Sequence, residues 1–160
     1  MNLPLVLLLL LMAANGAPIL AQRLLGPRFA LPLDGGLVLS DRRRLLGESK
    51  TLRGVLSALL LTPLVAMILG EPPWLGGVIA LGAMLGDALS SFLKRRLGRA
   101  PSSQALGLDQ IPEALLPLLL VSGPLALDGL TLGALVLAFL VLELLLSRVL
   151  YRLRIRRRPY

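Results

Sequence analysis

The sequence predicts an all-α integral membrane protein with five transmembrane helices, and three observations support this class. Hydrophobic residues make up 56% of the 160 positions and charged residues only 16%, and the mean hydropathy is +0.80. The apolar residues form long leucine-rich runs rather than the short alternating segments of a membrane β-barrel. Every lysine and arginine lies between these runs or near the end of the last one. The net charge of +8 is therefore explained by basic loops that set the membrane topology or bind anionic headgroups or substrates, rather than by binding to nucleic acid.

The five apolar segments each approach the length of about 17–25 residues that crosses ~30 Å of hydrocarbon. We expect the helices at residues 3–21, 54–70, 74–93, 111–127 and 130–150. The second and fourth are short and contain proline, which favours kinks or tilted packing. The third carries four glycines, which allow close contact with other helices. No linker or repeat divides the chain, so we expect a single membrane domain over residues 1–160.

The positive charges predict the orientation of the helices. Seven of the seventeen lysines and arginines fall within residues 22–53, four within 94–110 and six from Arg148 onward. With five crossings these regions lie on one side, which the positive-inside rule makes the cytoplasm. We therefore expect an outside N-terminus, cytoplasmic loops at 22–53 and 94–110, and a basic cytoplasmic tail at 151–160. This predicts a multi-pass protein of the plasma membrane whose active site faces the cytoplasm.

The first apolar segment has an alternative interpretation as a signal peptide, with small residues such as Ala21 near a cleavage point. No lysine or arginine precedes the segment, and cleavage with export would place the cationic residues 42–44 outside. Both facts favour a membrane helix.

Asp87 is an acid inside the third apolar segment, with Ser90, Ser91 and Lys94 on the same predicted helix face. An acid in hydrocarbon is costly and is by default a functional candidate. The alternative is a structural acid, neutralised by a neighbouring cation or kept protonated. Asp109, at the start of the fourth segment, is a second acid at the same membrane face.

These acids suggest a metal site. The chain has neither cysteine nor histidine, so a metal would be held by oxygen, which points to magnesium, calcium or manganese. Of these we expect Mg²⁺, with Mn²⁺ as an alternative. We predict that an ionised Asp87 holds Mg²⁺ together with Asp109.

The first predicted loop mixes many cations with glycines that let a backbone approach a ligand, which suggests a polyphosphate cradle. Topology charge or lipid-headgroup contact is the alternative, and the sequence "GESKT" lacks the glycine spacing of a Walker loop. We predict that Lys50 and Arg53, with Lys94 and Arg95 at a wet interface, contact phosphates.

Two further features concern the helices themselves. Asn15, beside Gly16 and Pro18, suggests a broken first helix that lines a polar cavity. Glu143 and Ser147, four residues apart on the fifth helix, either face the bundle or lie toward the interface.

Five stretches resemble the CDP-archaeol synthase family, the CTP:archaetidate cytidylyltransferases, and more distantly the CDP-diacylglycerol synthases. They are "ANGAP" at 14–18, "PLDGG" at 32–36, "DRRRLLGESKTLRG" at 41–54, "LGDALSSFLKRRLG" at 85–98 and "LDQ" at 108–110. The family has five helices and a CTP site formed by two cytoplasmic loops, which agrees with the topology expected from charge.

The resemblance implies roles for individual residues. The implied catalytic residues are Asp87, Asp109, Lys50 and Lys94, and the metal ligands are Asp87 and Asp109. The residues expected to bind CTP and phosphate lie within the same stretches: Asn15, Asp41, Arg43, Arg44, Lys50, Thr51, Arg53, Ser91, Lys94, Arg95 and Gln110.

The implied reaction is attack of a lipid phosphomonoester on the α-phosphorus of CTP, giving a CDP-lipid and pyrophosphate. After "LDQ" the archaeal pattern usually continues with an acidic and aromatic pair, whereas Ile111, Pro112 and Glu113 follow here. Cytidylyl transfer is thus better supported than an ether-lipid acceptor, and a phosphatidic-acid-like substrate stays open.

The expected partners are CTP, an anionic lipid phosphate and membrane lipids, without nucleic acid, and a homo-oligomer is compatible with the sequence. Two alternative functions are a CTP-dependent polyprenol kinase and a non-catalytic membrane scaffold or lipid carrier.

Overall fold

The computed structural model describes residues 2–100, 103, 105 and 107–152, which form five helices and no strand. The helices are α1 (Leu3–Leu25), α2 (Leu52–Ile68), α3 (Pro73–Arg96), α4 (Gln110–Ser122) and α5 (Gly129–Arg152). The prediction of five helices is confirmed. Most of the predicted tail, from residue 153 onward, lies outside the described residues.

Local sequence signals set the helix boundaries. The Thr51 hydroxyl accepts a hydrogen bond of 3.2 Å from the Gly54 N–H and caps α2. Pro73 opens α3, where its missing N–H costs nothing. The Asp128 carboxylate accepts the Thr131 N–H at 2.8 Å and caps α5. Gly26 ends α1 at a φ of 57°, a conformation that glycine adopts without strain.

Two expectations about the helices are wrong. α4 ends at Ser122 rather than at residue 127, because Gly123 and Pro124 follow and Pro124 has no N–H to continue the ladder. The predicted break near Asn15 is absent, since α1 is continuous through Pro18. The Asn15 side chain instead donates a hydrogen bond of 3.0 Å to the Leu11 carbonyl within the same helix.

α3 is the central helix and contacts α1, α2 and α4, whereas α5 packs on α1 and α4. Three glycines of α3 meet prolines of its neighbours. An added Cβ would lie 2.7 Å from Pro63 Cα at Gly76, 2.5 Å from Pro117 Cα at Gly82, and 2.2 Å from a carbonyl oxygen of α4 at Gly86. Backbones therefore approach at distances that no side chain would permit.

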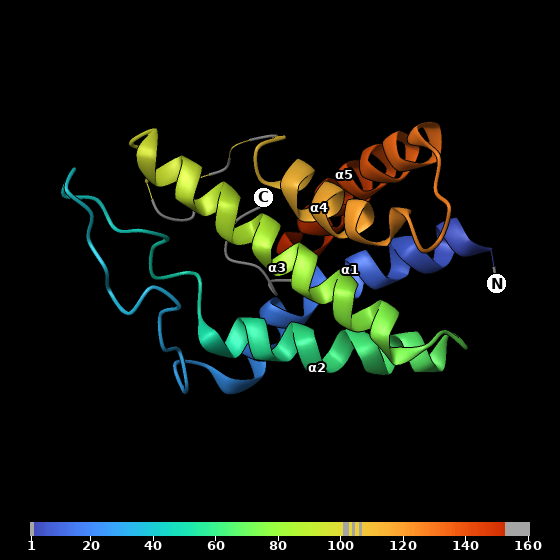
Figure 1. The fold of residues 1–160 in the computed structure, drawn as a ribbon. Helices are drawn as coiled ribbons and strands as arrows, with labels where there is room; N and C mark the ends of the chain where they lie inside the picture. The colour runs from blue at the N-terminus through green and yellow to red at the C-terminus, as the bar shows by residue number, and fades with distance from the viewer. Residues whose placement is uncertain (1, 101–102, 104, 106, 153–160) are drawn as a thin grey trace.

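The two ends of the bundle carry different connections, as Figure 1 shows. The long segment between α1 and α2 lies beside the C-terminal end of α3, while the α2–α3 and α4–α5 connections lie at the opposite end. Within the part of the chain that the structure describes, three helices are long and apolar enough to cross a membrane: Leu3–Leu25, Pro73–Arg96 and Gly129–Val149. α2 and α4 are shorter apolar helices.

Candidate functional site

Two lysine–aspartate ion pairs lie at the basic end of α3. Lys50, just before α2, pairs with Asp87 in α3. Lys94 in the last turns of α3 pairs with Asp109 at 2.6 Å. The structure thus brings together, as adjacent ion pairs, the four residues that the sequence analysis assigned to catalysis. With Glu113 they form what we call the charged centre.

Glu113 in α4 is the member of the charged centre that the sequence analysis did not select. Its side chain is in hydrogen-bonding contact with Asp87, and the residue is only 9% exposed. The charges of Lys50 and Asp87 both act on it. The sequence does show an acid, Glu113, three residues after Gln110 at the start of the fourth apolar segment. Helix periodicity, however, does not predict which residue of another helix such an acid will contact.

Gly86 explains why α3 and α4 can place these two carboxyl groups together. Its missing side chain allows the Pro112 carbonyl and the Glu113 N–H into the space that a Cβ would fill. Asp87 follows Gly86 on one helix and Glu113 follows Pro112 on the other. The contact between the acids is therefore a consequence of backbone approach.

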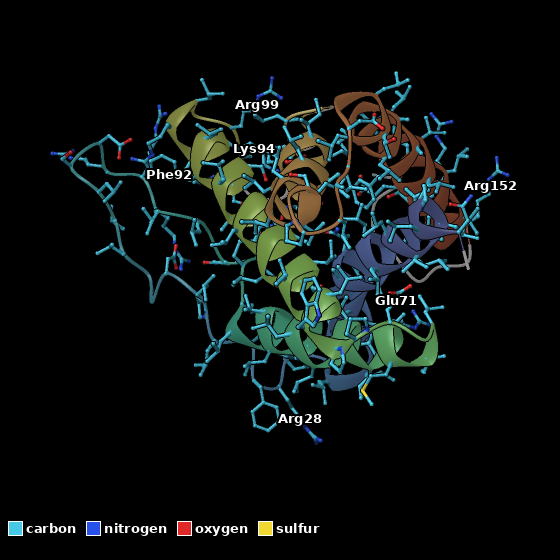
Figure 2. The ribbon with its side chains drawn as sticks, turned by 45° about the vertical axis from the view of Figure 1, so that its right-hand side comes forward. Arg28, Glu71, Phe92, Lys94, Arg99 and Arg152 are labelled. Atoms are coloured by element: carbon cyan, nitrogen blue, oxygen red, sulfur yellow. The ribbon has the colours of Figure 1, made fainter. Side chains whose placement is uncertain are left out.

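Lys94 is buried rather than located at a wet interface as expected, with 7% of its surface exposed. Figure 2 shows it on the side of α3 that faces α4, whereas Phe92 lies toward the first loop. Its ammonium also donates a hydrogen bond of 3.2 Å to the Ser103 carbonyl. A buried ammonium needs such partners because desolvation is costly.

Asp109 and Gln110 organise the turn before α4 with their side chains. The second Asp109 carboxylate oxygen accepts the Ala105 N–H at 3.1 Å, and the Gln110 amide oxygen accepts the Gly107 N–H at 2.9 Å. Gln110 is 5% exposed. These contacts fix the direction in which Asp109 faces Lys94.

Asp34 holds the first loop in shape and was not among the predicted site residues. Its two oxygens accept the N–H groups of Gly36, Leu46 and Gly47 at 3.0–3.1 Å and the Arg44 guanidinium at 2.7 Å. Burial alone would raise the pKa of the Asp34 carboxyl, but these donors, Gly47 first, hold that pKa well below its usual range.

Two arginines at the junction of the first loop and α3 bind backbone carbonyls, and Arg96 also binds a carboxylate. Arg43 donates to the carbonyls of Arg95 and Arg96 at 3.2 and 2.7 Å. Arg96 donates to the Arg44 carbonyl at 2.8 Å and pairs with Asp41 at 2.6 Å. We call the reciprocal contacts of Arg43, Arg96 and Asp41 the arginine clasp, because they fasten the first loop to α3.

The remaining predicted residues occupy several environments. Arg53 donates to the carbonyls of Gly26 and Arg28 at 2.8 and 2.6 Å, so it fastens the start of α2 to the end of α1. Thr51 uses its hydroxyl as the α2 cap. Ser91 is buried in α3, near the C-terminal end of the helix. Their assignment to CTP binding remains a prediction.

Glu143 of α5 is close enough to act electrostatically on Glu113. Ser147 is 2% exposed. This part of α5 therefore faces the bundle beside the charged centre. Of the two alternatives for Glu143 and Ser147, the bundle-facing one is observed rather than a position toward the membrane interface.

Comparisons with known proteins agree with this geometry. The model of a CarS-like family described as CDP-archaeol synthase matches residues 74–160. A CDP-archaeol synthase of Thermofilum pendens is 40% identical over 122 residues, covering 73% of this chain and 56% of that protein. One from Sulfurisphaera tokodaii is 36% identical, with 81% of each chain covered. The chain thus spans little more than half the length of the first relative.

A solved structure described as an intramembrane enzyme for archaeal membrane lipid biosynthesis has a similar fold. It superposes with a TM-score of 0.72 at 35% identity, covering 89% of this chain and 91% of that one. The similarity therefore extends over nearly the whole bundle.

Proposed function

The chain belongs to the CarS-like CDP-archaeol synthase family, and we propose that it is a CTP-dependent cytidylyltransferase that converts a lipid phosphate to a CDP-lipid. It is an all-helical membrane protein, like the intramembrane enzyme whose fold it shares. The proposed acceptor is an archaetidic-acid-like lipid. Its acyl counterpart, phosphatidic acid, is the alternative acceptor that the experiment below tests.

The observation that carries this proposal is the charged centre. Two lysines and three acids meet there among apolar helices, and Lys94 and Glu113 are nearly inaccessible to solvent. Buried ionisable groups of this kind are costly to stability, which favours a function for them. A reaction between two phosphate-bearing substrates needs such cations to lower anion–anion repulsion.

In the proposed reaction an oxygen of the lipid phosphomonoester attacks the α-phosphorus of CTP. A phosphorus–oxygen bond forms to the lipid, the bond between the α- and β-phosphates breaks, and its electron pair leaves with pyrophosphate. The attacking phosphate has a second pKa of about 6 and is largely a dianion at neutral pH, so no base is required. Lys50 and Lys94 would hold the reacting phosphates and neutralise charge.

The donor set of the charged centre suits Mg²⁺. Among the described residues no three acids are arranged to form a complete protein cage, but Mg²⁺ commonly uses one or two carboxylates and takes its other ligands from substrate phosphates and water. Asp87 and Asp109 would hold it. When bound, the ion would neutralise phosphate charge, and Mn²⁺ would serve the same role.

The proposed orientation places the charged centre at the cytoplasmic face of the plasma membrane, where CTP is available. Most lysines and arginines of the described residues belong to the first loop or to the end of α3 and the segment after it, and these lie at the same end of the bundle (Figure 1). Labelling of single cysteines at Ser49, Ser102 and Tyr160 should report one side and at Pro72 the other; Ser102 and Tyr160 lie outside the described residues. Labels at Ser49 and Ser102 on opposite sides would contradict a site built from two loops.

The direct test is incubation of the purified protein with α-labelled CTP, Mg²⁺ and a panel of archaetidic acid, phosphatidic acid and a polyprenol. We expect CDP-lipid and pyrophosphate in equal amounts, with archaetidic acid preferred. A phosphorylated polyprenol with CDP as by-product would identify a kinase. Folded protein that consumes no CTP with any lipid would support a scaffold or lipid carrier instead.

A further inference from the structure

The segment that leads from the last turn of α1 into the first loop carries a run of exposed apolar side chains. Residues 24–33 have the sequence LLGPRFALPL, with a single charge, and we call them the apolar turn. Their five large apolar side chains are 39–83% exposed: Leu24, Leu25, Phe29, Leu31 and Leu33. Large exposed apolar side chains that follow one another in a connecting segment favour an interaction surface.

The apolar turn is held firmly against the start of α2. The Leu33 N–H donates to the Lys50 carbonyl at 2.7 Å, and the Leu52 N–H donates to the Leu31 carbonyl at 2.9 Å. Arg53 donates to two further carbonyls of the turn at 2.8 and 2.6 Å. The backbone polar groups of the turn are thus used within the protein, while its apolar side chains are left outside.

Phe29 is the member of the turn with the least favourable backbone. Its φ is 56°, in the left-handed region that residues with a side chain seldom adopt. The hydrogen bonds on either side fix this conformation, and it directs the ring outward, where the residue is 72% exposed. A strained residue that gains no burial within its own chain is a reason to seek an external partner.

The surface on either side of the apolar turn shows what that partner is. α1 is long and apolar enough to cross a membrane, and its Leu20 and Leu24 lie one turn apart with 51% and 83% exposed. Leu56 and Leu60 are likewise exposed along one face of α2. The turn lies beside the start of α2 at the rim of the bundle (Figure 1), with Arg28 directed away from the helices (Figure 2). It therefore continues the lipid-facing surface of these two helices.

We propose that the apolar turn is an interfacial anchor, in which Phe29 and Leu31 enter the lipid leaflet at the basic end of the bundle. This part of the first loop then lies in the membrane interface rather than in water. Aromatic rings are favoured at that depth, and the leaflet removes from water the apolar surface that the protein leaves exposed. The proposal does not depend on the reaction performed at the charged centre.

The anchor has a consequence for the charged centre because Lys50 is paired with its backbone. Lys50 is also the partner of Asp87 in α3. The depth of the apolar turn in the leaflet therefore sets the depth at which this lysine meets the helix bundle.

Tryptophan fluorescence in phosphatidylcholine nanodiscs tests the proposal, since both faces of a nanodisc are open to a soluble quencher. The probe is Phe29→Trp in a Trp74→Phe background, which leaves one tryptophan in the chain. Bromine near the headgroup end of the acyl chains should lower its emission by about twofold or more, because interfacial side chains lie about 5–10 Å into the headgroup–acyl boundary. Iodide in the water should quench it weakly.

Ser40→Trp in the same background is the matched control. Ser40 is an exposed residue of the same loop, between the bridged residues Val38 and Arg44 and outside the apolar turn. Iodide should quench this probe strongly and brominated lipid should not. Arg28→Met, added to the Phe29→Trp protein, removes the charge of the turn but keeps an apolar side chain, and should leave both kinds of quenching unchanged.

Three results would overturn the anchor. Phe29→Trp that behaves like Ser40→Trp would place the turn in water. Protection from iodide without quenching by brominated lipid would show that a second copy of the chain covers it. Release of the probe by Arg28→Met would mean that attraction to headgroups, rather than apolar insertion, holds the turn. If Phe29→Trp does not fold, Leu31→Trp, at a position 64% exposed, is judged by the same results.

Discussion

The charged centre and the arginine clasp lie at the same end of the molecule, yet their cations have different partners. In the charged centre Lys50 and Lys94 face carboxylates contributed by the helix bundle and its second loop. In the clasp Arg43 and Arg96 mainly face backbone carbonyls. A planar guanidinium donates several hydrogen bonds in fixed directions, whereas an ammonium is a compact charge that can exchange partners.

Burial sharpens this contrast. The side chains of Lys94 and Asp109 are 9% and 19% exposed, compared with 24% and 38% for Arg96 and Asp41. Solvent weakens the clasp pair, which therefore acts mainly by positioning the loop. The Lys94–Asp109 pair lies in a drier environment, and the Lys50 and Asp87 side chains, 20% and 25% exposed, are intermediate. An incoming phosphate would compete with the carboxylates for both lysines. The difference teaches that position relative to backbone carbonyls, rather than charge alone, separates structural from substrate-binding cations.

Asp87→Asn should have the largest effect on the charged centre. The substitution is nearly isosteric, but it leaves the Lys50 ammonium without its carboxylate, so we expect a protein that folds with lower stability than the wild type. We expect cytidylyl transfer to fall by about a hundredfold or more, with an altered Mg²⁺ requirement, because the substituted amide is a poor metal ligand. The measurement is CDP-lipid formation against Mg²⁺ concentration. Wild-type turnover with wild-type Mg²⁺ dependence would make Asp87 a structural acid.

Lys50→Met should lower transfer by about tenfold or more, mostly in kcat/KM, because one cation facing the phosphates is lost. Arg28→Met is the control, since the contact of Arg28 with Arg53 is made by its backbone carbonyl and survives the substitution. Steady-state kinetics with CTP and lipid phosphate provide the measurement. Similar kinetic effects in both variants would remove the distinction between the charged centre and the other cations.

Gly86→Ala should disturb the charged centre without touching a charge. The new Cβ would fall 2.2 Å from the Pro112 carbonyl oxygen, so α4 must move and Glu113 must shift from Asp87. We expect a loss of about 1–3 kcal/mol of stability and several-fold lower activity.

Gly77→Ala on the same helix is the matched control for this substitution. Among the described residues, no atom beyond the backbone of its own helix turn and its chain neighbours lies within 4 Å of the added carbon, so stability should be unchanged or higher by up to about 1 kcal/mol. Thermal or denaturant unfolding in detergent compares the two. Equal stability of both variants would refute the close approach of α3 and α4.

Sequence periodicity and charge placement predict the five helices and bring Asp87, Asp109 and Lys94 to one membrane face, because hydrophobic length and helix-face spacing are local properties. They do not predict which groups pair. Glu113 meets Asp87 only because Gly86 admits the Pro112 carbonyl, which is a property of two helices together. The same limit explains Arg43, whose contacts lie more than fifty residues away in the chain.

Asn15 shows a case in which the sequence predicts a helix break that the structure does not contain. A polar residue beside glycine and proline favours a helix break, but the side chain satisfies itself on the Leu11 carbonyl one turn earlier. Pro18 removes one hydrogen bond and leaves α1 continuous. Sequence signals for interruption thus compete with packing against α2, where Pro18 contacts the position of Gly54, and here packing prevails.

The smallest expected effect concerns Asp34, which positions the first loop from outside the charged centre. Its carboxylate accepts three backbone N–H groups and the Arg44 guanidinium, so Asp34→Asn should weaken the loop while leaving the helices intact. Hydrogen exchange at Leu46 and Gly47 should accelerate by about tenfold, with transfer activity reduced by less than that. Glu48→Gln is the control: it removes the other carboxylate that pairs with Arg44, and this side chain is 83% exposed. It should leave hydrogen exchange at Leu46 and Gly47 unchanged.

The pH dependence of the same loop has a definite sign. Because the folded-state pKa of Asp34 lies well below its usual range, its contribution is fully present above the unfolded value of about 3.9 and disappears as pH falls through the lower, folded value. Exchange at Leu46 and Gly47, corrected for intrinsic rates, should therefore stay constant from pH 7 to about pH 4. Acceleration between pH 7 and pH 5 would mean that another group controls the loop. Asp41 of the clasp would not explain it, because burial raises its pKa less than the Arg43 N–H and the Arg96 guanidinium lower it, so this carboxylate also stays ionised over that interval.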